Sequence, residues 1–176
     1  MSSFRNFLRW VSLFFLVMLF SLSEAKADTT ARQFQLSGGL GVFLVGGDVA
    51  NGKDAGASFD LAVEPEFFFS EHTSLAFRFD LNIGNPDSAN FEGRFRYYFD
   101  FANHPRINLY VGAGIGGLVN FDGPNFGALV LPLVGWQYDL TEQFKIGSDL
   151  SPNILFNGDD VSFGVRLLPV VVKWAF

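Results

Sequence analysis

The sequence predicts an all-β protein: an eight-stranded antiparallel up-and-down transmembrane β-barrel that follows an export signal. Three observations lead to this prediction. Apolar residues recur with a period of two, turn signals separate eight segments of strand length, and the chain ends on an aromatic pattern. Of the 176 residues, 49% are apolar and 17% are aromatic, at a mean hydropathy of +0.25. This composition excludes disorder and argues against a polytopic helical membrane protein.

Residues 1–27 are predicted to form a secretory signal peptide. Arg5 and Arg9 make a positive start, residues 10–22 an apolar core, and residues 25–27 the small-x-small cleavage site Ala-Lys-Ala. The apolar run is shorter than the roughly 20 residues that a membrane anchor needs. Cleavage leaves residues 28–176 as one barrel domain, with nine Lys and Arg against 17 Asp and Glu, so the net charge changes from −6 to −8. A chain this acidic is not expected to bind nucleic acid.

Strand periodicity is clearest between residues 74 and 83. Apolar side chains take the odd positions, and polar or small ones, including Arg78 and Asp80, take the even positions. Connections rich in Gly, Asn, Asp or Pro separate the segments, and the odd-numbered connections are longer or richer in these residues, as in barrels with short periplasmic turns. The eight predicted strands cover residues 33–45, 57–69, 74–84, 91–101, 107–119, 126–139, 144–156 and 161–175.

Aromatic residues are expected near both ends of the strands, with aliphatic residues between them. This layering is typical of the interfacial girdles of a lipid-facing barrel. One predicted girdle comprises Phe67, Phe69, Tyr97, Phe99, Phe101, Trp136, Tyr138, Phe144, Trp174 and Phe176. The other comprises Phe43, Phe59, Phe91, Phe121, Phe126, Phe156 and Phe163. A soluble periplasmic lipocalin-like barrel, which alternates with its apolar face inward and binds a ligand there, is the alternative architecture.

Charged residues at mid-strand positions must point inward if the apolar face meets lipid, because an ionised group against lipid costs about 2–4 kcal/mol near the midplane. The charged face carries Asp60, Glu64, Glu66, Arg78, Asp80, Glu92, Arg94, Arg96 and Asp100. From these we predict an interior charge network of Glu64, Glu66, Arg78, Asp80, Arg94 and Arg96. Direct pairing of neighbouring strands would place Arg78 opposite Glu64 or Glu66, and Asp80 opposite Arg94 or Arg96.

The final strand ends with Trp174 and Phe176. In this feature and in its strand pattern over residues 28–176, the chain resembles the small eight-stranded bacterial outer-membrane β-barrel family (outer membrane protein β-barrel domain). The resemblance implies a location in the outer membrane of a Gram-negative cell, surrounded by outer-membrane lipid and lipopolysaccharide. It also implies that the barrel-assembly machinery reads Trp174 and Phe176 as an assembly signal. We expect a monomer.

Four prolines fit poorly with predicted strands, because each removes a hydrogen-bond donor from the ladder. They are Pro65, Pro132, Pro152 and Pro169. Bulges would reconcile them with a closed barrel, and the apolar parity does change near Pro169.

No catalytic, cofactor-binding or metal site is predicted. The absence of cysteine excludes thiolate chemistry. Residues 112–117 match G-x-G-x-x-G, with Asp139 about 20 residues on, but no helix is predicted to follow. We expect Gly112, Gly114 and Gly116 to make room in the lumen for large side chains such as Arg94 or Tyr98.

The remaining polar candidates have simpler explanations. His72 and His104 lie in predicted periplasmic turns, at the wrong end of the barrel for a lipid-modifying enzyme. Asp48, Asn51 and Asp54 lack the spacing of a calcium loop. We therefore expect a non-enzymatic outer-membrane barrel with a structural or surface-interaction role. The alternatives are a narrow porin-like channel for small or hydrophobic solutes and the soluble ligand-binding barrel.

Overall fold

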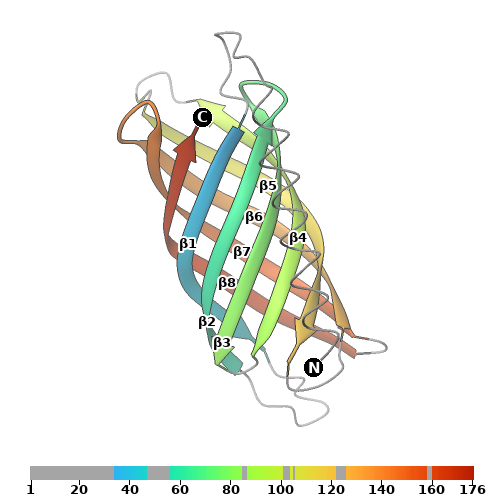
Figure 1. Ribbon diagram of the computed structural model, residues 1–176. Coiled ribbons are helices and arrows are strands. Elements are labelled where there is room, and N and C mark those ends of the chain that lie inside the picture. The colour runs from blue at the N-terminus through green and yellow to red at the C-terminus, as the bar shows by residue number, and fades with distance from the viewer. Residues whose placement is uncertain are drawn as a thin grey trace. The chain divides into compact units, whose positions relative to one another are not determined.

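Eight antiparallel strands close into a barrel in the computed structural model (Figure 1). The structure describes residues 34–46, 56–84, 87–100, 104, 106–121, 126–157 and 160–176, so the predicted signal peptide lies outside the described residues. Each strand pairs with the next, and β8 pairs with β1, which confirms the predicted fold class. The strands are β1 (Phe34–Val45), β2 (Gly56–Phe68), β3 (Thr73–Gly84), β4 (Ser88–Asp100), β5 (Ile107–Asn120), β6 (Phe126–Asp139), β7 (Phe144–Asn157) and β8 (Asp160–Ala175).

The predicted boundaries agree with the observed ones to within one residue, except at β4. This strand begins at Ser88, three residues before the predicted start. The extension is polar on its inner face, where Asn82 donates to the Ser88 hydroxyl over 2.9 Å. Apolar periodicity does not predict this part of the ladder, because both strands carry polar residues there. Within the described residues, the protein has no helix with the length and hydropathy of a membrane span.

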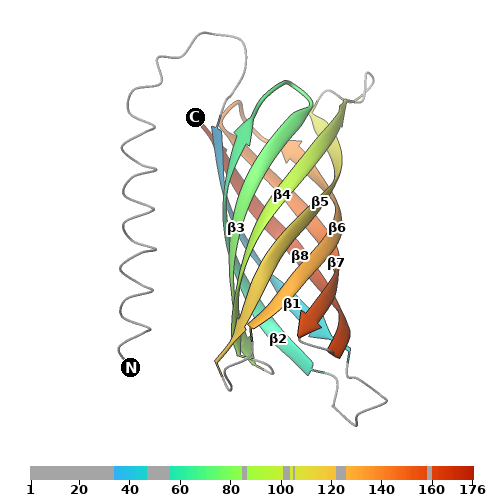
Figure 2. The same cartoon turned by 90° about the vertical axis from the view of Figure 1, so that its right-hand side faces the viewer.

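The barrel has two distinct ends. The turn end carries the connections β2–β3, β4–β5 and β6–β7 together with Phe34 and Phe176, and the loop end carries the other four connections (Figures 1 and 2). At the turn end, the Phe176 N–H donates to the Phe34 carbonyl over 3.1 Å and closes the first strand onto the last. The loop-end connections differ in length, because residues 46–55 separate β1 from β2 and only residues 158–159 separate β7 from β8. Residues 158–159 are Gly and Asp, so the last connection fits the predicted pattern by composition and not by length.

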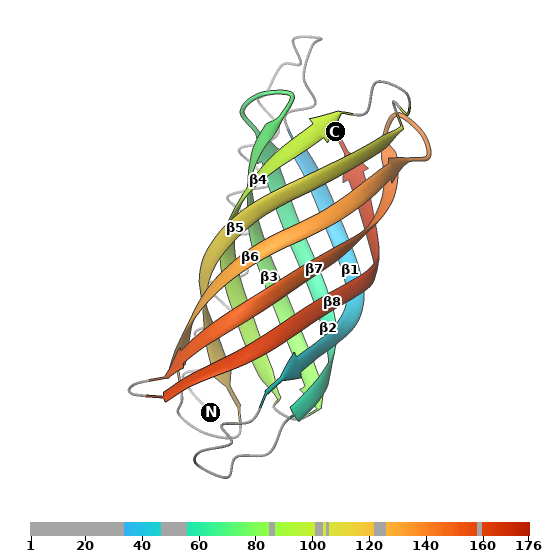
Figure 3. The same ribbon diagram turned by 180° about the vertical axis from the view of Figure 1, so that it is seen from behind.

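The wall of the barrel is apolar outside and polar inside, as the alternation predicted. Leu40, Leu81 and Val170 are 51%, 41% and 53% exposed, whereas the charged side chains between the apolar positions are buried. This arrangement rules out the lipocalin-like alternative, whose apolar face would point inward. Seen from behind, the strands β5 to β8 run obliquely to the barrel axis (Figure 3). Closure of a sheet into a barrel requires such a tilt.

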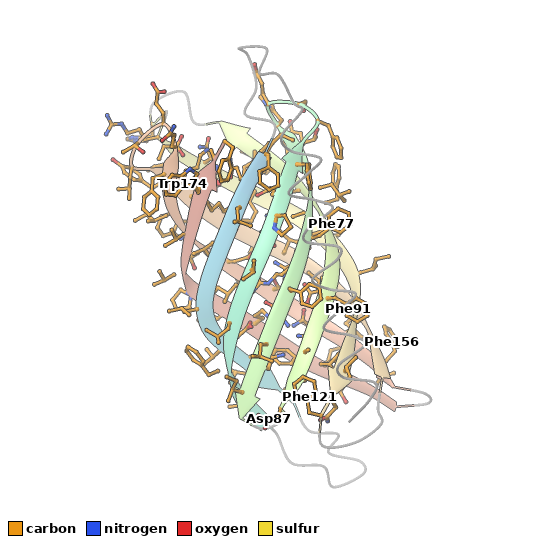
Figure 4. All side chains as sticks on the ribbon, in the orientation of Figure 1. Phe77, Asp87, Phe91, Phe121, Phe156 and Trp174 are labelled. Atoms are coloured by element: carbon orange, nitrogen blue, oxygen red, sulfur yellow. The ribbon has the colours of Figure 1, made fainter. Side chains whose placement is uncertain are left out.

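Aromatic side chains surround the wall at both ends. At the turn end, the rings of Phe34 and Phe176 lie 5.6 Å apart and those of Trp174 and Phe176 lie 6.3 Å apart. Figure 4 shows Trp174 toward this end and Phe121 toward the loop end. The prediction that Phe43 belongs to a girdle is wrong, because its side chain is fully buried and points into the lumen. Phe101 and the side chains of Phe126 and Asp100 lie outside what the structure describes.

The four prolines are accommodated in two ways. At Pro169 the register of β8 shifts against both neighbours, between Leu40 and Val42 of β1 and between Gly147 and Asp149 of β7, so the bulge predicted there is confirmed. The register of β2 and β3 is the same on both sides of Pro65, and that of β6 and β7 is the same on both sides of Pro132 and Pro152. Bulges at these three prolines are therefore excluded. The ladder is interrupted there without a change of register.

The assignment of the outer face can be tested at Phe79, which pairs with Phe91 at the middle of β3 and faces outward. We expect Phe79→Arg to lower the free energy of unfolding in a bilayer by about 2–4 kcal/mol, because Arg would be placed against lipid. Phe79→Leu is the matched control and should fold nearly as well as the wild type. Urea titration of protein reconstituted in vesicles measures both. Equal stability of the two variants would contradict the assignment.

Candidate functional site in the barrel lumen

Inward-facing positions of five strands bring together 11 buried charged side chains, which we call the lumen network. They are distributed over β2, β3, β4, β7 and β8, on opposite walls of the barrel. The alternation of strand side chains places them there, because each lies at an inward position between apolar outward ones. The lumen network consists of Asp60, Glu64, Glu66, Arg78, Asp80, Glu92, Arg94, Arg96, Asp149, Arg166 and Lys173.

The part of the lumen network nearest the turn end is centred on Arg96. Its guanidinium binds both carboxylate oxygens of Glu64, with Nη1–Oε1 at 2.6 Å and Nη2–Oε2 at 2.8 Å. Nη1 also lies 3.0 Å from Glu66 Oε2. The other oxygen of Glu66 accepts hydrogen bonds from the hydroxyls of Ser74 and Tyr98, each at 2.5 Å. Two-point pairing of this kind sets the orientation of the guanidinium as well as neutralising its charge.

Asp149 of β7 joins the two walls of the lumen. Its Oδ2 lies 2.8 Å from Arg94 Nη1, 3.0 Å from Arg78 Nη1 and 3.7 Å from Arg96 Nη2. Three arginines from β3 and β4 therefore share one carboxylate from the far side of the barrel. Their mutual repulsion is offset because each arginine also pairs with a second carboxylate. The pairs are Arg78 with Asp80, Arg94 with Glu92 and Arg96 with Glu64.

Arg166 of β8 makes the second connection across the lumen, toward the loop end. Its Nε lies 2.7 Å from Asp60 Oδ2, and its Nη1 lies 2.6 Å from Glu92 Oε1 and 3.2 Å from Asp80 Oδ2. Arg78 Nε binds the other oxygen of Asp80 at 2.5 Å. Strands β2, β3, β4 and β8 are thus linked through one guanidinium.

The inner face of β5 is lined by glycine where it meets the charged side chains of β4. Gly112, Gly114 and Gly116 pair with Arg96, Arg94 and Glu92. A Cβ atom on Gly114 would lie 3.1 Å from Arg94 Cγ, and one on Gly116 would lie 2.8 Å from Glu92 Cγ. The expectation that these glycines make room for large lumen side chains is therefore confirmed at Gly114 and Gly116, whereas a Cβ atom on Gly112 would meet the Phe95 backbone and Leu133. The segment is a strand and not a nucleotide loop.

Apolar clusters fill the rest of the lumen around the lumen network. Toward the loop end, Phe43 packs with Leu118 and Leu155, and the Arg166 guanidinium lies 5.0 Å above the Phe43 ring. A second cluster contains Tyr98, Tyr110, Leu131 and Leu133, and the Arg96 guanidinium lies 4.9 Å from the centre of the Tyr110 ring. A cavity of about 10 Å³ lies between them, beside Glu64, Arg78, Arg96 and Asp149, and holds at most one water molecule. The lumen is a packed polar core.

All six side chains of the predicted network are buried in the lumen, but their partners differ in part from those expected. The register places Arg78 opposite Glu64, as predicted, yet the nearest carboxylates to Arg78 are those of Asp80 and Asp149. The expectation for Asp80 is wrong: it pairs with Asn90 on β4 and not with Arg94 or Arg96. Because β4 begins earlier than predicted, its register against β3 differs from the expected one. Arg94 and Arg96 therefore lie opposite Ala76 and Ser74, further toward the turn end than expected.

Sequence reasoning left five members out of the predicted network: Asp60, Glu92, Asp149, Arg166 and Lys173. The first two belong to the charged face, but no partner was assigned to them. The last three lie on β7 and β8. The only sign of them in the sequence is that each is an isolated charge at an inward position of its strand. Their partners on β2, β3 and β4 are more than 50 residues away in sequence, so no local pattern joins them.

The residues that the structure describes include some of the other polar candidates of the sequence. Among those residues, no cluster of three or more His, Asp or Glu is arranged to hold a metal ion. His72 and His104 belong to connections at the turn end, away from the loop end. Asp48, Asn51 and Asp54 lie outside the described residues.

Two solved structures share the architecture of this chain. Neisserial surface protein A superposes with a TM-score of 0.64 at 12% identity, covering 85% of this chain and 100% of that one. A structure from the de novo design of transmembrane β-barrels superposes with a TM-score of 0.50 at 13% identity, with the same coverage. This protein has the fold of a transmembrane β-barrel. No family model and no curated protein matches the sequence of this membrane barrel.

The pairing of Arg96 with Glu64 can be measured in the membrane barrel by a double-mutant cycle. We expect Arg96→Met and Glu64→Gln each to lower the free energy of unfolding by about 3–5 kcal/mol, because each leaves its partner charged and buried. The double variant should lose much less than the sum of the two. Arg96→Lys, which keeps the charge but not the two-point geometry, is the control and should lie between. Additive losses in urea titrations would show that the pair is not coupled.

Proposed function

We propose that the protein is a non-enzymatic integral barrel of the bacterial outer membrane, with a structural or surface-interaction role. The observation that carries the proposal is the filled lumen. Charged groups from five strands pair with one another, and apolar clusters that include Phe43 and Tyr110 pack against them. A lumen of this kind holds the wall together and leaves the outer surface and the loops to make contacts with other molecules.

The proposed orientation places the turn end in the periplasm and the loop end at the cell surface. The long connection 46–55 would then be exposed outside the cell. Export would follow removal of residues 1–27, and the assembly machinery would read Trp174 and Phe176. These two side chains support that role because they are 50% and 68% exposed on the last strand. The barrel would function as a monomer among lipid and lipopolysaccharide.

A surface-interaction role is also consistent with the name of Neisserial surface protein A, which shares the fold. The rival function is a narrow channel. The charged side chains that line the middle of the lumen favour it, but their ion pairs occupy the space that a solute would need. Conduction would require at least one cross-lumen arginine to leave its carboxylates, which is unfavourable in a poorly solvated interior.

Conductance separates the two functions. We expect the wild-type barrel in a planar lipid bilayer to show no steady ionic current under a voltage at which a 16-stranded porin, the positive control, conducts. The physical reason is that an eight-stranded interior is already filled by its side chains. A stable, ion-selective current that changes with Arg94→Gln or Arg78→Gln would favour the channel and contradict the closed core.

Fractionation tests the location. We expect the protein in the outer-membrane fraction, with the mass of residues 28–176 and with faster gel mobility before boiling than after it, because the closed ladder resists detergent. Protease added to intact cells should cleave within residues 46–55 and leave the turn end intact. Recovery in the soluble periplasm, or retention of residues 1–27, would contradict the proposed location and processing.

A further inference from the structure

The lumen network contains more carboxylates than cations. Among the described residues, its carboxylates are Asp60, Glu64, Glu66, Asp80, Glu92 and Asp149, and its cations are Arg78, Arg94, Arg96, Arg166 and Lys173. Lys145, which is also buried, pairs with Asp139 over 3.2 Å and leaves this difference unchanged. An uncompensated charge in a poorly solvated interior is unfavourable, so one carboxylate of the network needs a positive charge that the protein cations do not supply.

All the cations of the network can be paired without Asp60. The pairs are Arg78–Asp80 at 2.5 Å, Arg94–Asp149 at 2.8 Å, Arg96–Glu64 at 2.6 Å, Arg166–Glu92 at 2.6 Å and Lys173–Glu66 at 3.6 Å. Asp60 does contact Arg166, with Oδ2 2.7 Å from Nε, but it shares that guanidinium with Glu92 and Asp80. Asp60 is therefore a candidate for the carboxylate in excess.

The two oxygens of Asp60 have different surroundings. Oδ2 faces Arg166 and, at 3.7 Å, Arg78 Nη2, whereas Oδ1 is buried and has neither a hydrogen bond nor an ion pair among the described residues. Asp149 Oδ1 is unpaired too, but three arginines surround Asp149 Oδ2 and stabilise its negative charge. Asp60 has only one close arginine, and β1 presents Gly41 to it. The excess is therefore best placed on Asp60.

A second unpaired acceptor faces Asp60 across the β2–β3 ladder. Asn82 lies directly opposite Asp60, and both side chains are buried in the lumen. The Asn82 amide nitrogen donates to Ser88 on β4 over 2.9 Å, so the amide oxygen is turned toward β2 and Asp60. This oxygen has no partner among the described residues. A hydrogen on Asp60 Oδ1 would supply the donor that both acceptors lack.

We propose that the lumen binds one proton between Asp60 Oδ1 and the amide oxygen of Asn82. Asp60 is then a neutral carboxylic acid that donates to Asn82 and accepts from Arg166, and the remaining charges of the lumen network balance. The inference concerns the interior and does not depend on the structural or surface role proposed above. Loss of the proton leaves a negative charge opposite a bare amide oxygen, so the stability of the barrel becomes sensitive to pH.

The surroundings of Asp60 favour a proton over a metal ion or a water molecule. A metal ion would lie beside the guanidinium groups of Arg166 and Arg78, and no cluster of His, Asp or Glu among the described residues is arranged to hold one. A water molecule would donate to both oxygens but leave the excess charge in place. Neither Asp60 nor Asn82 lines the cavity described above, and a proton needs no cavity.

The dependence of stability on pH tests the proposal, because unfolding ionises Asp60 and releases the bound proton. The charged groups around Asp60 are Arg166 from β8, Arg78 and Asp80 from β3, and Glu92 from β4. We expect the unfolding constant of the wild type, divided by that of Asp60→Asn, to rise about tenfold per pH unit until Asp60 ionises in the folded barrel. Urea titrations in vesicles between about pH 6 and 8 measure this ratio, from which the groups common to both proteins cancel.

The stability of Asp60→Asn at neutral pH is a separate reading. Asn has the shape of the neutral acid, and its amide can donate to Asn82, so we expect an unfolding constant within about tenfold of the wild type, the scale of one hydrogen bond. Glu64→Gln is the matched control and should raise the constant about a hundred- to a thousandfold, because it removes a paired charge. An Asp60→Asn protein that does not fold, or that loses as much as Glu64→Gln, would show that Asp60 is charged.

Infrared spectroscopy detects the proton directly, because the carbonyl stretch of a protonated carboxyl group is distinct from the bands of an ionised carboxylate. We expect this band in the wild type in vesicles at neutral pH. Asp60→Asn should lack it and Asp149→Asn should keep it. A wild-type spectrum without the band, its loss in Asp149→Asn alone, or a stability ratio that responds to sodium concentration and not to pH would overturn the proposal.

Discussion

The hydrocarbon of a bilayer offers no hydrogen-bond partner to a peptide group, and the rest of this structure depends on that constraint. Each strand must find its donors and acceptors on its neighbours, so the sheet must close. β8 returns to β1, and the Phe176 N–H completes the closure on the Phe34 carbonyl. Closure in turn leaves an inside and an outside, and the alternation of side chains assigns every second residue to each.

The charges inside the barrel follow from the same constraint. Charged side chains are excluded from the lipid-facing positions, and those that occupy inward positions are too buried to be neutralised by water. They neutralise one another instead, through contacts that cross the lumen. Asp149 and Arg166 make these contacts and connect strands that are distant in the ladder. The glycines of β5 contribute by removing the side chains that would otherwise compete for this space.

The prolines show where the constraint is relaxed. Pro169 is absorbed by a bulge, which restores pairing on both sides of it. Pro65 removes one donor, and the facing pair Pro132 and Pro152 removes two at the same height without any change in register. The ladder therefore loses more donors between β6 and β7 than between β2 and β3.

The sequence by itself determined the strands, the turns and the face that most residues occupy, because these depend on a period of two that needs only neighbouring residues. It placed Glu64, Arg94 and Arg96 inside and Trp174 outside. It did not determine that Phe43 lies inside, that Asp80 faces Asn90, or that Asp149 joins three arginines. Those facts depend on register and on contacts across the lumen. The register of β3 and β4 decides the pair Asp80–Asn90. Only closure of the tertiary structure decides the contacts of Asp149, because it brings together residues from opposite walls that share no local pattern.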